Sequence, residues 1–488
     1  MSYFTELGHQ FIDGEWRAGS GSWDIIDFNP YNNEKLAAIT VATVKEVDAA
    51  YEAAARAQTA WAETDPYERR RIFESAVRVI EENTAEFAEI ITDELGGNRA
   101  KSVIELTSAI EHLRQAMVTT VPDESVSSPS PEPGRYNQVF RRPIGVVTVI
   151  SPYNFPLATA MMSVAPALAM GNAVVLKPNQ NSPVSGGGLV AKVLEDAGLP
   201  AGVLNVLVTD IAEIGDALIE HPVPKVISFS GSEEVGRHVA EIAARNLKRA
   251  VLQLSNNAAF LVLDDVRGER LDYAVRAAVS SRFVFQGQVC MAANRILVDR
   301  SIADEFTEKF VAAVRRLKVG DPRDPETHIG PLINSLHVEA MQNTVKQALA
   351  EGATALVHGA SYGNFVEPTV LTGLPEDSPI LRQEIFGPVA LLATFDGEED
   401  GIRMANDTPY GLTAAVHTPD LERGARVARR IGAGMVHVNS TTNLQDVTVM
   451  FGGDGRSGLG RLNGRHAIDL FSTEQWVSIR TDMPEVPL

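Results

Sequence analysis

The chain contains a single cysteine, Cys290, among 488 residues. One cysteine cannot form an internal disulfide bond, and it has no companions for a thiolate metal site, so we expect no metal. A chain this poor in cysteine is typical of a reducing compartment, and we expect the protein to be cytoplasmic. The first residues lack a basic region followed by an apolar core, so the sequence predicts no secretory signal.

Basic side chains are in the minority. Lysine and arginine number 43 against 63 aspartates and glutamates, a net charge of −20. This charge repels phosphate backbones, so we expect no nucleic-acid partner. From Pro143 to Leu176 no residue is charged, a run long enough for a membrane span. Because proline, glycine and asparagine interrupt the run, we interpret it as two buried strands and a buried helix, and expect no membrane partner.

Strands and helices alternate through the middle of the chain, whose length suits about three domains. We predict strands at Val146–Ile150, Ala173–Leu176, Val203–Val208, Lys225–Phe229 and Ala250–Leu254, and helices at Leu157–Met170, Val184–Ala197, Ile211–Glu220 and Glu233–Leu247. This alternation predicts an α/β fold with a parallel sheet, which binds ligands outside the carboxyl ends of its strands. A second alternation, from Phe260 to Val438, predicts another α/β domain, which contains Cys290.

Two regions flank this pattern. Before it, the sequence predicts amphipathic helices at Val44–Glu63, Pro66–Glu82 and Ala85–Leu95. Between them and the sheet, residues 122–142 are rich in proline and serine and end in a strand-like piece, Gln138–Arg142. This piece predicts an edge hairpin with basic ends. The alternative is a flexible linker.

Cys290 lies in the segment Phe285–Asn294, which has no clean periodicity. A lone cysteine is more often a small buried apolar residue than a nucleophile, by roughly two to one. Here Gly287 allows close approach of the backbone to a ligand, and uncharged amides flank the thiol. We therefore interpret the segment as a loop that presents a nucleophilic thiol.

Polar residues follow three of the predicted strands. Asn154, in Ser151–Pro156, has a side chain that could stabilise an oxyanion, or merely satisfy a turn between two prolines. Lys177 ends the next strand, and alone it is most simply a solvated lysine. In Phe229–Gly236 a glycine turn leads into a helix whose first N–H groups could bind phosphate. By contrast, Gly453–Gly458 fits G-x-G-x-x-G but opens no predicted helix, so we reject a dinucleotide fingerprint there.

Together these segments resemble motifs of the aldehyde dehydrogenase superfamily. The nucleophile motif is F-x-x-x-G-Q-x-C, which here ends at Cys290, and E-I-F-G-P is unchanged at Glu384–Pro388. Ser151–Pro156 is similar to P-W-N-F-P with Tyr153 in place of tryptophan, Lys177–Pro183 to K-P-[AS]-E-x-[ST]-P, and Phe229–Gly236 to F-T-G-S-x-x-x-G. The pieces look most like the benzaldehyde, vanillin and salicylaldehyde dehydrogenases.

The resemblance implies three parts and an assembly. Residues 1–121 and 143–255 would form a Rossmann-type cofactor-binding domain, and residues 256–455 an α/β catalytic domain. Residues 122–142 and 474–482 would form a small β oligomerisation arm, giving a homodimer or homotetramer.

The resemblance also implies roles for single residues. Cys290 would attack the aldehyde, and Asn154 with the Cys290 N–H would hold the oxyanion. Residues that would bind NAD or NADP are Ser151, Lys177, Gln180, Gly231, Ser232, Gly236, Glu384 and Phe386. Residues that would line an apolar substrate tunnel are Phe155, Met162, Val289, Met291 and Phe451.

The stretch Leu252–Asn257 departs from the family's L-E-L-G-G-[KN]-[NS]. Gln253 stands where the family has its general-base glutamate, and Ser255 and Asn256 replace two glycines beside the nicotinamide. Glutamine takes no proton from water at ordinary pH. We therefore expect intact hydride transfer and poor hydrolysis of the acyl-enzyme. The alternatives are transfer of the acyl group to coenzyme A, and a catalytically weak protein that only binds the cofactor. Likewise Gln180 replaces an acidic ribose ligand, which opens the site to NADP.

Overall fold

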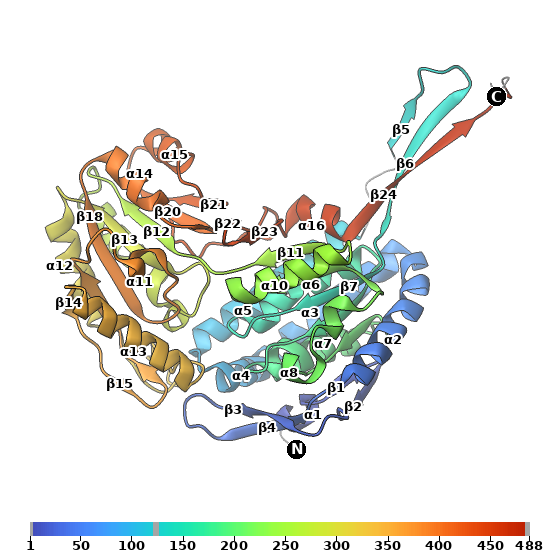
Figure 1. Cartoon of the computed structure of the whole chain (residues 1–488), viewed down its shortest axis with the longest axis horizontal. Helices are drawn as coiled ribbons and strands as arrows, with labels where there is room; N and C mark the ends of the chain where they lie inside the picture. Colours follow the sequence, from blue (N-terminus) through green and yellow to red (C-terminus); the bar gives the residue numbers. More distant parts are fainter. Residues whose placement is uncertain (1–2, 121–125, 484–488) are drawn as a thin grey trace.

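The computed structural model describes residues 3–120 and 126–483, which form two large sheets and a protruding arm (Figure 1). The first sheet has the order β2-β1-β9-β8-β7-β10-β11-β23. Its strands are β1 (Gln10–Ile12), β2 (Glu15–Arg17), β7 (Val146–Ile150), β8 (Ala173–Lys177), β9 (Leu204–Val206), β10 (Pro224–Ser230), β11 (Arg249–Gln253) and β23 (Gly458–Leu459). The strands from β9 to β11 are parallel, as predicted, whereas β1, β2 and β23 extend the two edges antiparallel.

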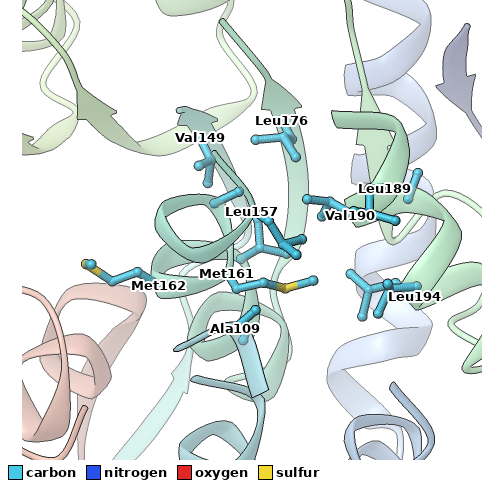
Figure 2. Packing of buried hydrophobic residues seen from close by; sticks show 14 of the residues in the cluster. Ala109, Val149, Leu157, Met161, Met162, Leu176, Leu189, Val190 and Leu194 are labelled. Carbon is cyan, nitrogen blue, oxygen red and sulfur yellow. The ribbon is translucent and has the colours of Figure 1, made fainter. Parts of the chain in front are cut away.

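The first sheet is covered on both faces because its side chains alternate. Val149 and Leu176 point into a core built with α6 (Pro156–Ala169) and α7 (Leu189–Asp196), where Met161 and Leu194 meet them (Figure 2). The neighbouring Val175 faces the other way, toward α2 (Val44–Glu63). α10 (Glu233–Arg245) packs on the same face as α2 and covers β10 and β11. The uncharged run from Pro143 to Leu176 is therefore buried strand, helix and strand, as predicted.

The remaining helices of the first half complete these cores. On the α6 face they are α1 (Tyr3–Leu7), α3 (Pro66–Glu82), α4 (Thr84–Leu95) and α5 (Arg99–Thr119), and on the α2 face α8 (Ile211–Ile214) and α9 (Ala217–Glu220). α5 packs on α6, on the side of the sheet opposite α10. A separate hairpin of β3 (Asp24–Phe28) and β4 (Lys35–Thr40) lies at the end of the molecule near the N-terminus (Figure 1).

The second sheet confirms the second α/β alternation and has the order β14-β17-β18-β13-β12-β20-β21. Its strands are β12 (Ala258–Val262), β13 (Ala293–Asp299), β14 (Thr354–Val357), β17 (Thr369–Thr372), β18 (Val389–Phe395), β20 (Thr413–His417) and β21 (Met435–Val438). Its helices are α11 (Glu269–Phe283), α12 (Ala303–Val314), α13 (Ser335–Ala350), α14 (Glu398–Asn406) and α15 (Leu421–Ala428). Short pairs of strands, β15 (Ser361–Tyr362) with β16 (Phe365–Val366) and β19 (Tyr410–Gly411) with β22 (Asp454–Gly455), complete this part.

The arm is a three-stranded antiparallel sheet that projects from the body (Figure 1). β6 (Arg135–Pro143) pairs along its length with β24 (Ser472–Arg480), which follows α16 (Gly464–Phe471), and also with β5 (Val126–Pro129). The hairpin prediction is thus confirmed and the linker alternative is wrong for residues 126–143. Residues 122–125 of the predicted arm, and residues 1–2 and 121 of the predicted cofactor domain, lie outside the described ranges.

Two predicted helices are broken. The helix predicted at Val184–Ala197 opens with a wide π-helical turn, Val184–Gly188, because consecutive glycines let it press against Leu7 and the Glu94 carboxylate accepts its first N–H groups. The helix predicted at Ile211–Glu220 is divided at Gly215, which has a φ of +54°. In the described ranges, no helix is long and apolar enough to cross a membrane.

Candidate functional site

One cavity of about 990 Å³ holds most of the residues singled out from the sequence. It runs past the carboxyl ends of β7, β8, β10 and β11, where a parallel sheet places its ligands. The predicted catalytic and tunnel residues that line it are Cys290, Asn154, Gln253, Phe155, Met162, Val289, Met291 and Phe451. The predicted cofactor residues that line it are Ser151, Lys177, Gly231, Ser232, Glu384 and Phe386.

Two predicted cofactor residues do not line the cavity. Gln180 is exposed, although its neighbours Asn179 and Asn181 are part of the wall. Gly236 faces Leu254, and a Cβ there would collide with the leucine side chain, so this glycine lets α10 pack closely on the sheet. The role of Gln180 stays a prediction.

The loop that carries Cys290 is held in an unusual backbone conformation. Phe285, Gln286 and Gly287 have successive φ values of +48°, +54° and +74°, which are costly for the two residues with side chains. The buried Arg282 guanidinium compensates by donating to the carbonyl oxygens of Gly287 and Gly387, at 3.0 and 2.7 Å. A Cβ at Gly287 would collide with that guanidinium and with Gly387. The loop therefore requires this glycine, and it presents the half-buried Cys290 to the cavity.

Asn154 lies in the loop between β7 and α6, next to the nucleophile loop. Its Nδ2 donates to the Gln288 carbonyl oxygen at 3.0 Å. A side-chain amide has two N–H donors, so the second remains free for an oxyanion beside Cys290.

A buried ion pair that the sequence did not predict lies beneath these two loops. Lys101 and Glu105, one turn apart on α5, are paired and only 1% and 0% exposed. Lys101 Nζ lies 4.6 Å from the centre of the Phe155 ring and 4.5 Å from that of Phe285, within range of cation–π attraction. A Glu105 oxygen accepts the Leu157 N–H at 2.8 Å, at the start of α6. The pair thus joins the Asn154 loop to the Cys290 loop.

Glu384 also lines the cavity. It is hydrogen-bonded to the stretch Leu252–Asn257, which departs from the family pattern. Its carboxylate accepts the Asn256 backbone N–H at 2.9 Å, and the nearby Ser255 side chain also acts to lower its pKa. Burial raises the pKa of Glu384 to about 7, against the lowering effect of these groups. The Asn256 side chain donates to the Cys290 carbonyl oxygen at 3.0 Å. Asn256 therefore connects Glu384 with the nucleophile loop.

The Cys290 thiol is not activated by its surroundings. Burial, and then the negative charge of Glu384, raise the pKa of Cys290 to about 12. The thiol is consequently protonated at neutral pH, and it needs a base or an added positive charge before it can attack.

Gln253, at the end of β11, is buried and lines the cavity. Among the described residues, neither its Oε1 nor its Nε2 has a hydrogen-bond partner. Its amide lies beside Gly452, in the segment that also contains Gly453–Gly458. That segment forms β22 and β23 and opens no helix. An unpartnered buried amide is costly, so this side chain is poised for a ligand or water in the cavity.

The other end of the cavity offers groups for a dinucleotide. Ser232 caps α10, accepting the Val235 N–H at 3.4 Å, so that the helix N-terminus faces the cavity. Lys177 ends β8, and burial lowers its pKa. Ser151 Oγ is buried without a hydrogen-bond partner among the described residues. Glu384 supplies a carboxylate whose remaining lone pairs are free for ribose hydroxyls. These residues fit a nicotinamide dinucleotide.

Comparison with known proteins identifies the family. A family profile described as "Aldehyde dehydrogenase family" matches residues 16–477. The benzaldehyde dehydrogenase YfmT of Bacillus subtilis is 47% identical over 100% of both chains. A succinate-semialdehyde dehydrogenase of Paenarthrobacter nicotinovorans is 39% identical over 91% of this chain and 98% of its own.

Solved structures agree with these relatives. The crystal structure of an NAD-dependent benzaldehyde dehydrogenase from Corynebacterium glutamicum superposes with a TM-score of 0.89 at 39% identity, and the match covers 98% of this chain and 97% of that one. The predicted fold class and the predicted resemblance are both confirmed. The chain belongs to the aldehyde dehydrogenase family.

Proposed function

We propose that the protein oxidises an aromatic aldehyde to the acid level, with Cys290 as nucleophile and NAD or NADP as hydride acceptor. The observation that carries this proposal is the shared cavity, in which Cys290, Asn154 and Glu384 meet at the carboxyl ends of the first sheet. The aldehydes in the names of the two relatives differ: benzaldehyde is aromatic and uncharged, whereas succinate semialdehyde carries a carboxylate. Phe155, Met162, Val289, Met291 and Phe451 form an apolar wall that favours the aromatic ring.

The first half of the reaction uses the two loops above the Lys101–Glu105 pair. The Cys290 sulfur bonds to the aldehyde carbon, and the carbonyl oxygen becomes an oxyanion. The free N–H of Asn154 and the backbone N–H of Cys290 stabilise that oxyanion. Because its pKa is raised, the Cys290 thiol is protonated and must lose its proton in this step. A neutral Glu384 favours that loss, since a negative charge on Glu384 raises the pKa of Cys290.

The nicotinamide cofactor, when bound, accepts the hydride that leaves the aldehyde carbon. Ser232 and the N-terminus of α10 would bind its pyrophosphate, and Lys177 and Glu384 would bind its riboses. With the neutral Gln180 in place of an acidic residue, a 2′-phosphate is not repelled at that position, so NADP as well as NAD is a candidate cofactor.

The second half removes the acyl group from sulfur. After hydride loss the acyl carbon and Cys290 form a thioester, and water must attack it. Gln253 occupies the position of the family's base, and its amide can orient water but cannot take the proton. Hydrolysis is therefore the slow step of this enzyme.

A rapid-mixing experiment tests the proposal. The protein is mixed with benzaldehyde and either NAD or NADP, and reduced nicotinamide is followed by absorbance. We expect a burst of about one equivalent per site, followed by slow turnover. The absence of a burst with both cofactors would sink the proposal. Cys290→Ser is the control, because it removes only the nucleophilic sulfur.

Transfer of the acyl group to coenzyme A is a second candidate. The unpartnered amide of Gln253 favours it, because a thiol arrives with its own acidic proton and needs a weaker base than water does. Adding coenzyme A after the burst separates the two candidates. Sustained turnover with an acyl-thioester product supports transfer, and an unchanged slow rate supports hydrolysis.

The organisation of the chain follows from the same proposal. We assign cofactor binding to residues 1–121 and 143–255, and catalysis to residues 256–455. We assign subunit contact to residues 122–142 and 474–482, which would make the protein a homodimer or homotetramer. The near absence of cysteine supports a cytoplasmic location.

A further inference from the structure

The cavity extends onto both faces of the first sheet. On the α10 face its wall contains Lys177, Asp210 and Ser232, which suit a dinucleotide. On the opposite face its wall is built by α5, α6 and the segment Thr441–Gln445. Cys290 lies between the two ends, so an aldehyde and a dinucleotide can reach it from opposite sides. We call the α5 end the aldehyde mouth.

A stripe of α5 side chains forms one wall of the aldehyde mouth. Val103, Ile104, Thr107, Ser108 and Glu111 line it, at spacings that place them on one helix face. Val103 is 40% exposed and Ile104 is 54% exposed, so this wall is open to solvent. The sequence does not reveal the stripe, because only the fold places α5 over α6.

The aldehyde mouth contains one charged group, the carboxylate of Glu111. In the described part of the chain, no lysine or arginine lines this end, since Lys177 lies at the cofactor end. Lys101 is close behind the ring of Phe155, but Glu105 neutralises it. His112 anchors Gln445, with their Nε2 atoms 3.2 Å apart, and burial lowers the pKa of His112 to about 3, so it too carries no positive charge.

We propose that Glu111 makes the aldehyde mouth selective by charge, so that the enzyme prefers uncharged or cationic aromatic aldehydes to aldehydes that carry an additional anionic group. This inference rests on the proposed aldehyde oxidation and narrows its substrate class. A carboxylate on the ring finds no cation to pair with, and it is repelled by Glu111. Ring hydroxyl groups are tolerated, because Thr107, Ser108, Asn443 and Gln445 offer hydrogen bonds.

The expected preference against anionic aldehydes is modest because the aldehyde mouth is open to solvent. Two like charges about 4 Å apart in water lower a binding constant by roughly fivefold, and more where water is partly excluded. Loss of hydration of the substrate carboxylate against Val103 and Ile104 adds to this penalty. We therefore expect a preference on the order of tenfold for benzaldehyde over 4-formylbenzoate.

The experiment compares these two aldehydes by the concentration dependence of the burst, which does not depend on the slow second half. The measured quantity is the ratio of kburst/KM for benzaldehyde to that for 4-formylbenzoate. Glu111→Gln should lower this ratio about fivefold, and Glu111→Lys should lower it further by pairing with the substrate carboxylate. The control is Glu308→Lys, on the outer surface of α12, which changes the net charge by the same amount as Glu111→Lys. It should leave the ratio as in the wild type.

Salt gives an independent readout. The Debye screening length shortens from about 10 Å at 0.1 M to about 3 Å at 1 M ionic strength. High salt therefore weakens the repulsion by Glu111, and the wild-type ratio should fall toward that of Glu111→Gln. Equal use of both aldehydes by the wild type, or a ratio in Glu111→Lys equal to that of the wild type, would overturn the inference. A complete lack of a burst with benzaldehyde would instead refute the proposed function.

Discussion

At the scale of single residues, the proposed mechanism makes Gln253 the residue that limits turnover. We expect Gln253→Glu to raise the steady-state rate by about 10²–10⁴-fold, because a carboxylate can take the proton of the attacking water. The burst rate should change much less, since the first half of the proposed reaction depends on Cys290 and Asn154 and not on Gln253. Steady-state formation of reduced nicotinamide measures the effect.

The matched control for this change is Gln475→Glu, which makes the same substitution on the exposed arm. It should leave the steady-state rate as in the wild type. An unaltered steady rate in Gln253→Glu would mean that another residue already supplies the base.

Cys290 is the only thiol of the chain, so alkylation reports on it alone. Because the pKa of Cys290 is raised to about 12, the thiolate fraction, and with it the rate of reaction with iodoacetamide, should rise about tenfold per pH unit between pH 8 and 11. Glu384→Gln removes a nearby negative charge, so it should lower the thiol pKa and speed alkylation at a fixed pH. Mass spectrometry after timed labelling gives the rate. A pH-independent rate in this range would show that the thiol is already ionised.

At the scale of elements, α5 is joined to α6 and to the nucleophile loop by the Lys101–Glu105 pair. Lys101→Met leaves a buried carboxylate without its partner, which costs about 3–5 kcal/mol. The double change Lys101→Met with Glu105→Gln should recover most of that loss, because a neutral amide can still accept the Leu157 N–H. Urea titration measures the difference between the single and double variants.

An exposed pair with the same helical spacing provides the control. Arg70 and Glu74 have side chains that are 48% and 41% exposed. Arg70→Met should cost about 0.3–0.5 kcal/mol, as exposed helical pairs do. A Lys101→Met protein as stable as the Arg70→Met protein would show that the buried pair contributes nothing beyond a surface pair.

At the scale of the whole molecule, the projecting arm has β24 and β5 as its two edge strands, each paired on one side only, and such edges can pair with another chain. Val477→Pro interrupts the β24–β6 ladder, where Val477 is opposite Gln138. We expect this variant to have a smaller mass by light scattering, with the circular dichroism of the body retained. Met483→Pro, beyond the ladder, should keep the wild-type mass. An unchanged mass in Val477→Pro would show that assembly does not use the arm.

The sequence did not predict α5, and the reason is physical. α5 buries Lys101, Ser102, Glu105 and His112 together with its apolar residues, so its pattern of hydrophobic side chains is blurred. The charges on that face are satisfied only by partners distant in sequence, such as the rings of Phe155 and Phe285. No local pattern can show such partners.

The sequence by itself determined the α/β class and most helices and strands, and it singled out Cys290, Asn154, Gln253 and Glu384 as candidate site residues, because periodicity and short motifs are local properties. Only the tertiary structure decided that, among the described residues, the Gln253 amide has no hydrogen-bond partner, that the Asn256 N–H binds Glu384, and that Glu111 is the one charge in the aldehyde mouth. These properties depend on which distant segments pack together, and on how burial changes the free energy of a polar or charged group.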